Sequence, residues 1–375
     1  MGQWQTRAQA LYFNTSSTVL GQNTVDRAST NGGSATTLFT ATGSDLNHVN
    51  RCTAVAVDAL NSKLFLIDGP TGDMWSLNLD GTGLALVKSG LIGFPTDLAL
   101  DVLNQFIYYT TSSTLQGSNT VQRLGYAGGD PTTLITATGA VSGNGISRCT
   151  AIALDVPRGR IFIADAGAEK IWSMSLDGTG LAALATASNA VPTGVALDSG
   201  NQQVYFTLSS PVENSNRVMR VSYAGTGLTT LFTAGSGVQR CTALDLDLRG
   251  GFIYLSDAAA GDLWRIPLGG GTPSPILSGL TATAKKVRWF SGPEAPPSPD
   301  ITSLVVSGPK VIINATNGFV GGTYYLLTST NLSLPLSDWS SIATNVLGSS
   351  GSFSLTAPNP SESGSSRQFY VLRVQ

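Results

Sequence analysis

The tetrapeptide Arg-Cys-Thr-Ala occurs three times, and this repeat constrains the fold more than any other feature. The copies begin at Arg51, Arg148 and Arg240, so they are 97 and 92 residues apart, and they include every cysteine of the 375-residue chain. A propeller blade takes about 40–50 residues. A weaker copy of the segment lies midway between each pair. The spacing therefore predicts a chain of repeated blades in which the tetrapeptide marks every second one.

Each copy has the pattern of a short inner strand. Small and branched apolar residues alternate after a shared threonine, as suits an innermost propeller strand with little room around the axis. Five copies end on an aspartate that opens a turn. The six copies align on Thr53, Thr96, Thr150, Thr193, Thr242 and, in degenerate form, Thr283.

Three further strands complete each unit. The second is aromatic, as in Leu64-Phe65-Leu66-Ile67-Asp68, and the third leads into a glycine-rich turn such as Asp80-Gly81-Thr82-Gly83. Glycine supplies the positive φ that a tight hairpin needs. A fourth strand, for example Leu84 to Val87, closes each unit.

The two ends of this region complete each other. The first unit lacks an inner strand, whereas Thr283 to Phe290 is an inner strand with nothing after it. We predict that strand 283–290 closes the ring against the strands of residues 9–41, which leaves no open sheet edge at the seam. The expected fold is all-β, with a six-bladed β-propeller over residues 1–291.

A second domain follows a change in composition. Residues 292–299 contain four prolines and predict a stiff extended linker. Beyond it, short strands separated by Gly, Ser, Asn and Pro predict a small immunoglobulin- or fibronectin-like β-sandwich over residues 300–375. The expected strands are Ser303 to Val306, Val311 to Ala315, Thr323 to Ser329, Trp339 to Thr344, Ser352 to Leu355 and Gln368 to Val374.

The blade pattern resembles the YWTD propellers of the low-density-lipoprotein-receptor family and, more loosely, NHL propellers. Segments such as Phe65-Leu66-Ile67-Asp68 and Tyr254-Leu255-Ser256-Asp257 stand where that family has Tyr-Trp-Thr-Asp. The resemblance covers residues 1–290 and implies protein recognition on the propeller face.

The C-terminal segment resembles a domain that recurs at the C-termini of large secreted proteins from Verrucomicrobia-like bacteria. The matching residues are Gly322 to Leu332, Trp339 and the terminal Phe369-Tyr370-Val371. This resemblance implies an exported, multidomain context. The N-terminus lacks the basic and apolar regions of a signal peptide, so export would depend on a segment already removed or replaced.

Composition limits the possible partners. The net charge is −2 and only 12% of residues are charged, against roughly 25% in typical domains. No basic field attracts nucleic acid, and no apolar stretch is long enough to span a bilayer. The Thr-, Ser-, Asn- and Gly-rich surface is typical of extracellular or cell-surface β proteins, for which a protein or glycan ligand is expected.

We expect no enzyme, metal or cofactor site. His48 is the single histidine, so no multi-histidine metal site can form, and no nucleophile motif accompanies it. Six-bladed lactonases and lyases place carboxylates or histidines around the channel mouth, and the inner-strand starts of this chain carry no such set. A channel-mouth hydrolase or lactonase is a remaining alternative.

The cysteines are expected to be free, buried thiols. If neighbouring inner strands lie about 10 Å apart, alternate blades lie roughly 17 Å apart, whereas bridged Cα atoms must come within about 7 Å. Cys52, Cys149 and Cys241 are therefore predicted to pack as small apolar side chains.

The arginines of the repeat are candidate ligand-binding residues. Arg51, Arg148 and Arg240 would form a three-fold ring on one face and could hold a carboxylate or sulfate. The favoured alternative is structural, because three aspartates end the second strands of the same blades on the same face and would pair with the guanidinium groups. These aspartates are Asp68, Asp165 and Asp257.

Three long polar loops are expected to ring the same mouth: Thr15 to Asn23, Thr111 to Asn119 and Thr207 to Asn216. They could bind a glycan or a protein, although solvated connectors are the favoured interpretation. The leading hypothesis is a noncatalytic extracellular binding or adhesion protein. The main alternative is a structural subunit that self-assembles into a filament or surface layer.

Overall fold

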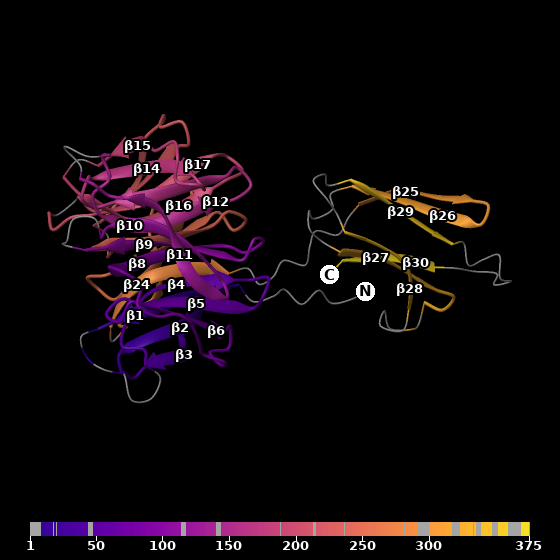
Figure 1. The fold of residues 1–375 in the computed structure, drawn as a ribbon, viewed down its shortest axis with the longest axis horizontal. Coiled ribbons are helices and arrows are strands. Elements are labelled where there is room, and N and C mark those ends of the chain that lie inside the picture. Colours follow the sequence, from indigo (N-terminus) through magenta and orange to yellow (C-terminus); the bar gives the residue numbers. More distant parts are fainter. Residues whose placement is uncertain are drawn as a thin grey trace. The chain divides into compact units, whose positions relative to one another are not determined.

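The structure of the protein is a computed structural model. It describes residues 9–17, 19, 21–43, 48–113, 118–139, 144–187, 189–212, 215–235, 237–280, 282–290, 300–316, 323–332, 334, 339–346, 352–358 and 369–374. The chain divides into two compact units, Met1–Gly292 and Pro293–Gln375. Every regular element in the described part is a β-strand (Figure 1). The expected linker, residues 292–299, lies outside the described residues.

Unit 1 consists of six four-stranded antiparallel sheets of the kind that form propeller blades. Five sheets follow the chain order of their strands. They are β4 to β7 (Cys52–Asp58, Lys63–Asp68, Asp73–Asn78, Ala85–Lys88), β8 to β11 (Phe94–Asp101, Phe106–Ser112, Thr120–Gly125, Gly128–Thr136), β12 to β15 (Cys149–Asp155, Arg160–Asp165, Lys170–Ser175, Ala182–Thr186), β16 to β19 (Val191–Asp198, Gln203–Ser209, Arg217–Ser222, Thr229–Thr233) and β20 to β23 (Cys241–Asp247, Phe252–Asp257, Asp262–Pro267, Ser274–Leu277).

The sixth sheet combines the two ends of the unit. Strand β24 (Thr283–Phe290) pairs with β1 (Ala10–Ser16), which continues into β2 (Asn23–Ser29) and β3 (Thr36–Ala41). The pairing places Phe290 opposite Ala10 and Thr283 opposite Ser16. One sheet thus contains both the first and the last strand of unit 1.

The innermost strands of the six sheets contact one another in cyclic order. Strand β4 contacts β8, and the contacts continue through β12, β16, β20 and β24 back to β4. Apolar side chains fill the spaces between neighbouring sheets; in one such core Phe65 and Met74 of one sheet meet Leu98 and Ile107 of the next. Burial of these apolar faces is the main favourable contribution to the free energy of folding when sheets pack against one another.

Threonine side chains link neighbouring inner strands. The Thr53 hydroxyl donates to the Pro95 carbonyl at 3.2 Å, and the Thr150 hydroxyl donates to the Pro192 carbonyl at 2.8 Å. Thr96 and Thr193 make equivalent bonds to the carbonyls of Cys149 and Cys241. These bonds satisfy backbone carbonyls on the free edges of the inner strands. They also place the beginnings of the inner strands side by side at one end of the axis.

The register of β24 differs from the alignment on Thr283. In β4 the pairing with the second strand is irregular between Cys52 and Ala54, and Thr53 lies in this irregularity. In β24 the same irregularity lies between Ala284 and Lys286. Lys285, not Thr283, therefore corresponds to Thr53. The alignment on Thr283 is displaced by two residues because it matches threonine to threonine. The other inner strands end on an aspartate that could have fixed the alignment, but β24 has Phe290 at that position.

Unit 2 contains two three-stranded antiparallel sheets, β25-β26-β29 and β28-β27-β30. Side chains from both sheets share one core, which includes Val311, Ile313, Tyr324 and Leu355. The strands are β25 (Asp300–Ser307), β26 (Lys310–Thr316), β27 (Thr323–Ser329), β28 (Ser340–Val346), β29 (Phe353–Pro358) and β30 (Phe369–Val374).

Candidate ligand-binding mouth of the propeller

The three aspartates of the repeat hold the loops that lead into the inner strands. The Asp68 carboxylate accepts bonds from the backbone N–H groups of Asn50 at 2.5 Å and Arg51 at 3.2 Å. Asp165 accepts from the backbone of Ser147 and Arg148, both at 2.8 Å. Asp257 does the same for Gln239 and Arg240. All three carboxylates are fully buried, and burial raises the pKa of Asp68.

These bonds correct the expected ion pairs. Within the described residues, no guanidinium group of Arg51, Arg148 or Arg240 pairs with one of the three aspartates. The carboxylates turn toward the main chain because a buried loop must satisfy its N–H groups. Arg148 and Arg240 are exposed, whereas Arg51 is partly buried and lies over the Phe94 ring. The aspartates therefore bond to the arginines through the arginine backbone and not through the side chains.

The three arginines and Lys285 surround one end of the axis. Each arginine directly precedes an inner strand, and the threonine bonds place those strand beginnings together. Lys285 occupies the threonine position of β24, and its pKa is lowered by burial and by the charges of Arg240 and Arg51. We call Arg51, Arg148, Arg240 and Lys285 the mouth cluster. Arg148 and Arg240 are exposed, and Arg51 and Lys285 are partly buried.

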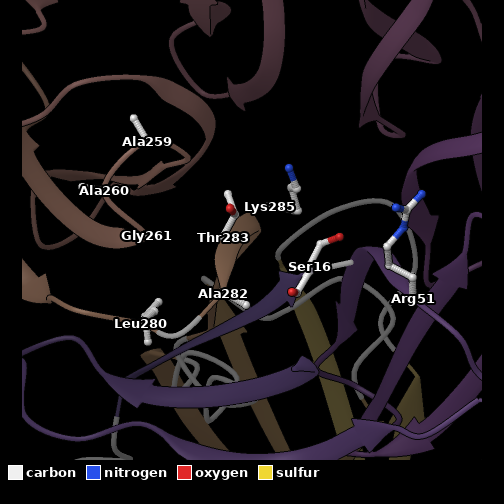
Figure 2. Close-up of a pocket in the computed structure, with 10 residues that line it drawn as sticks. Ser16, Arg51, Ala259, Ala260, Gly261, Leu280, Ala282, Thr283 and Lys285 are labelled. Atoms are coloured by element: carbon white, nitrogen blue, oxygen red, sulfur yellow. The ribbon is translucent and has the colours of Figure 1, made fainter. Parts of the chain in front are cut away.

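A pocket of about 440 Å³ opens beside the mouth cluster. In Figure 2 the side chains of Lys285 and Arg51 extend in the same direction, and Ser16 lies between them in this view. None of the described residues that line the pocket is acidic. These residues are Ser16, Ser17, Arg51, Ala259, Ala260, Gly261, Leu280, Ala282, Thr283 and Lys285.

The long loops begin at the same end, because β1, β9 and β17 run antiparallel to the inner strands. A buried asparagine holds the described part of each loop. The Asn216 side chain accepts from Ser210 N–H and donates to the Ser210 carbonyl, both at 3.0 Å, and Asn119 makes the same pair with Ser113. Asn23 accepts from Ser17 N–H at 3.0 Å. The loops thus start from fixed positions, and the exposed Val19 and Val212 lie on two of them.

The interior of the axis carries charged residues that replace alanine. Asp97 and Lys286 stand where other inner strands have Ala54 or Ala151. The Lys286 ammonium lies 3.1 Å and the Arg288 guanidinium 2.9 Å from the Asp97 carboxylate. We call Asp97, Lys286 and Arg288 the axial tie. Burial lowers the pKa of Lys286, and the nearby Asp97 opposes that shift.

The axial tie also satisfies the exposed edges of the inner strands. Asp97 accepts from Ile152 N–H at 3.1 Å, and Arg288 donates to the Leu98 carbonyl at 3.3 Å. Asp245, whose pKa is raised by burial, accepts from Trp289 N–H at 2.7 Å. A separate cavity of about 310 Å³ lies beside Asp245 and Arg288, and apolar residues of the inner strands form its walls.

The cysteine side chains belong to three of the apolar cores of unit 1. Cys52, Cys149 and Cys241 are unbridged and fully buried. Burial is the largest cause that raises the pKa of each thiol, to about 12 for Cys241. His48 is exposed, with a φ of 59°. In the part of the chain that the structure describes, no three His, Cys, Asp or Glu residues gather as metal ligands.

Sequence reasoning missed Lys285 and the axial tie. The available signal was a departure from the repeat, because a charged residue at a position that is otherwise Ala, Gly or Thr in the repeated inner strands must have a partner or a function. For Lys285 this departure is not visible in the alignment, which places Thr283 at the position that Lys285 occupies.

Comparison with solved structures supports a β-propeller fold for unit 1. A chain of the crystal structure of a nidogen/laminin complex matches with a TM-score of 0.62 and 17% sequence identity, over 76% of this chain and 99% of that one. TolB from Acinetobacter baumannii matches with a TM-score of 0.57 and 10% identity, over 76% of this chain and 67% of that one. No protein-family model matches the sequence. Among the described residues, no helix is long and apolar enough to cross a bilayer.

Proposed function

We propose that unit 1 is a closed six-bladed propeller that acts as a noncatalytic extracellular binding module and recognises a protein ligand at its mouth. The observation that carries this proposal is the mouth itself, where four cationic side chains and three anchored loops meet at one end of a rigid scaffold. Loops on rigid scaffolds are the common place for recognition. The solved relative belongs to a complex of nidogen with laminin, which supports a protein partner.

Exposed apolar side chains on the loops offer contact points. Val19 is 54% and Val212 is 58% exposed. Leu103 is 67% exposed in the turn after β8, at the opposite end of the inner strands, and provides a matched control. Apolar groups at the centre of an interface carry much of its binding energy.

The test is a screen of the whole chain on a protein array and a glycan array, followed by affinity measurements. We expect a protein ligand whose binding is weakened at least about tenfold by Val19→Asp or Val212→Asp and is unchanged by Leu103→Asp. The absence of any ligand, or equal losses at both ends of the propeller, contradicts the proposal.

For unit 2 we propose an immunoglobulin- or fibronectin-like sandwich of the type found in secreted bacterial proteins, and the two sheets around one core support it. Its edge strand supports a second candidate function, self-assembly into a filament or layer. Strand β25 pairs only with β26 among the described strands, and Leu304, Val305 and Val306 are 46%, 46% and 56% exposed. An exposed apolar edge is a template for pairing with another chain.

Electron microscopy of concentrated protein tests the second candidate. Ordered polymers that disappear in Val305→Lys support assembly through β25, because a lysine on an edge strand blocks pairing. Dispersed monomers at all concentrations, or polymers that persist in Val305→Lys, count against it.

A further inference from the structure

We propose that the mouth cluster is an anion site that takes the carboxylate groups of an acidic protein segment. The proposal rests on the proposed function of the mouth as a recognition surface, and it names the chemistry of the ligand.

The first argument is uncompensated charge. Arg148, Arg240 and Lys285 have no side-chain hydrogen bond or ion pair within the described residues. The aspartates nearest to them in the repeat are buried and bonded to the main chain. Like charges gathered around a low-dielectric opening raise the local concentration of a ligand of opposite sign. The end of the axis is therefore a region of positive potential in a chain whose net charge is −2.

The second argument is the supply of hydrogen-bond donors. The pocket offers the ammonium of Lys285 and the guanidinium of Arg51, with hydroxyl groups from Ser16, Ser17 and Thr283. The Arg51 Nε atom is buried and has no hydrogen-bond partner within the described residues. A carboxylate accepts several charge-assisted bonds at once, so it suits this set of donors.

The third argument separates a peptide from a sulfated sugar. The described residues of the pocket lining include no aromatic side chain on which a sugar ring could stack. Phe94 lies nearby, but the Arg51 guanidinium covers its ring at 5.7 Å from the centroid. Alanine and leucine side chains form the rest of the wall, and they suit the methylene groups of a glutamate. An acidic segment therefore matches both the charged and the apolar parts of the pocket.

The test measures binding of a fluorescein-labelled decapeptide of glutamate to the whole chain by fluorescence anisotropy, with the glutamine decapeptide as the uncharged probe. We expect binding of the glutamate peptide only, with an affinity that falls as salt increases. Lys285→Thr should weaken it about tenfold, the equivalent of one charge-assisted hydrogen bond. Threonine stands at the corresponding position of the other five inner strands, so this variant should keep the fold.

Two further variants make the result specific. Arg240→Gln removes an exposed charge of the mouth cluster and should also weaken binding. Lys88→Gln removes one positive charge from the outermost strand β7, where Lys88 pairs with Asp130 at 3.2 Å, and should change the affinity less than about twofold. If Lys285→Thr and Lys88→Gln weaken binding equally, the peptide senses only net charge and the proposed site is wrong.

A sulfated oligosaccharide serves as the competing probe. Its binding with the same sensitivity to Lys285→Thr, together with no binding of the glutamate peptide, overturns the acidic-peptide assignment. Failure of the anion site can be distinguished from failure of the proposed function. A protein ligand that is lost in Val19→Asp but unaffected by Lys285→Thr leaves the recognition surface in place and refutes the anion site.

Discussion

The Lys286 ammonium lies 3.1 Å from the Asp97 carboxylate, and the two residues join β24 to β8 across the axis of the propeller. Strand β4 stands between these strands in the cyclic order, so the pair connects blades that are not neighbours. Both side chains are buried, with exposed fractions of 7% and 2%. Strand β24 is thus held from its inner edge as well as by its sheet.

We expect Asp97→Ala to lower the free energy of unfolding by about 3–5 kcal/mol, because it leaves Lys286 and Arg288 as buried cations without this partner. Lys286→Ala added to that variant should recover a large part of the loss, since Ala54 and Ala151 occupy the equivalent positions in other strands. Denaturant unfolding measures both variants. Equal losses in the single and the double variant would show that charge pairing is not what the axial tie contributes.

Thr150→Val should lower the free energy of unfolding by about 1–2 kcal/mol. The substitution keeps the shape but removes the 2.8 Å hydrogen bond to the Pro192 carbonyl of the next blade, and an unsatisfied buried acceptor is costly. Thr132→Val on the outer strand β11 is the matched control, because Thr132 is exposed, and its effect should stay within about 0.5 kcal/mol. A loss of the same size in the control would refute a special role for threonines between inner strands.

Lys285→Thr should stabilise the protein by about 0.5–1 kcal/mol at neutral pH, because it removes a partly buried cation from the neighbourhood of Arg51 and Arg240. The pKa of Lys285 in the folded state is below 10.5. Between the folded-state pKa and 10.5 the unfolded state binds more protons than the folded state, so the free energy of unfolding of the parent protein rises with pH.

Thermal unfolding between neutral and alkaline pH tests this expectation. The advantage of the variant should shrink as the pH rises through the folded-state pKa toward 10.5. A variant that is less stable than the parent at pH 7 contradicts the prediction. If Lys285→Thr stabilises the protein and also weakens peptide binding, Lys285 is kept for binding at the expense of stability.

The three thiols should react with a thiol reagent at pH 8 only when the protein opens. Cys52, Cys149 and Cys241 are fully buried, and burial raises the pKa of each. The open state of a stable protein is populated at about 10⁻³ or less, so labelling should be slower than in denaturant by at least about that factor. Mass spectrometry over time measures the rate. Fast labelling of any one thiol in the native protein would place it at the surface.

The repeat allowed much of the propeller to be predicted. Thr53 and its equivalents begin alternating segments of small and branched apolar residues, which suit strands close to the axis, and these segments form the inner strands. Lys285 could not be placed correctly, because β24 ends on Phe290 where other inner strands end on an aspartate, and the alignment had no aspartate to follow.

The bonds of Asp68 show a second limit of the sequence. Charge alone suggested a guanidinium partner, but the carboxylate bonds to the N–H groups of Asn50 and Arg51. The choice depends on the path of the main chain in the loop, which periodicity does not specify. Trp172 is similar, because its indole N–H reaches the Asp165 carboxylate at 3.2 Å from the third strand of the sheet.

The pairing of Phe290 with Ala10 also determines when this protein can finish folding. At about 5–20 residues per second, a ribosome needs roughly 15–55 s to travel from the first of these residues to the second. Throughout that time β1 has no inner neighbour, and the blade that is started first is completed last. A transcript cut short before Thr283 would therefore leave β1 with an unpaired edge, a natural target for chaperones and proteases.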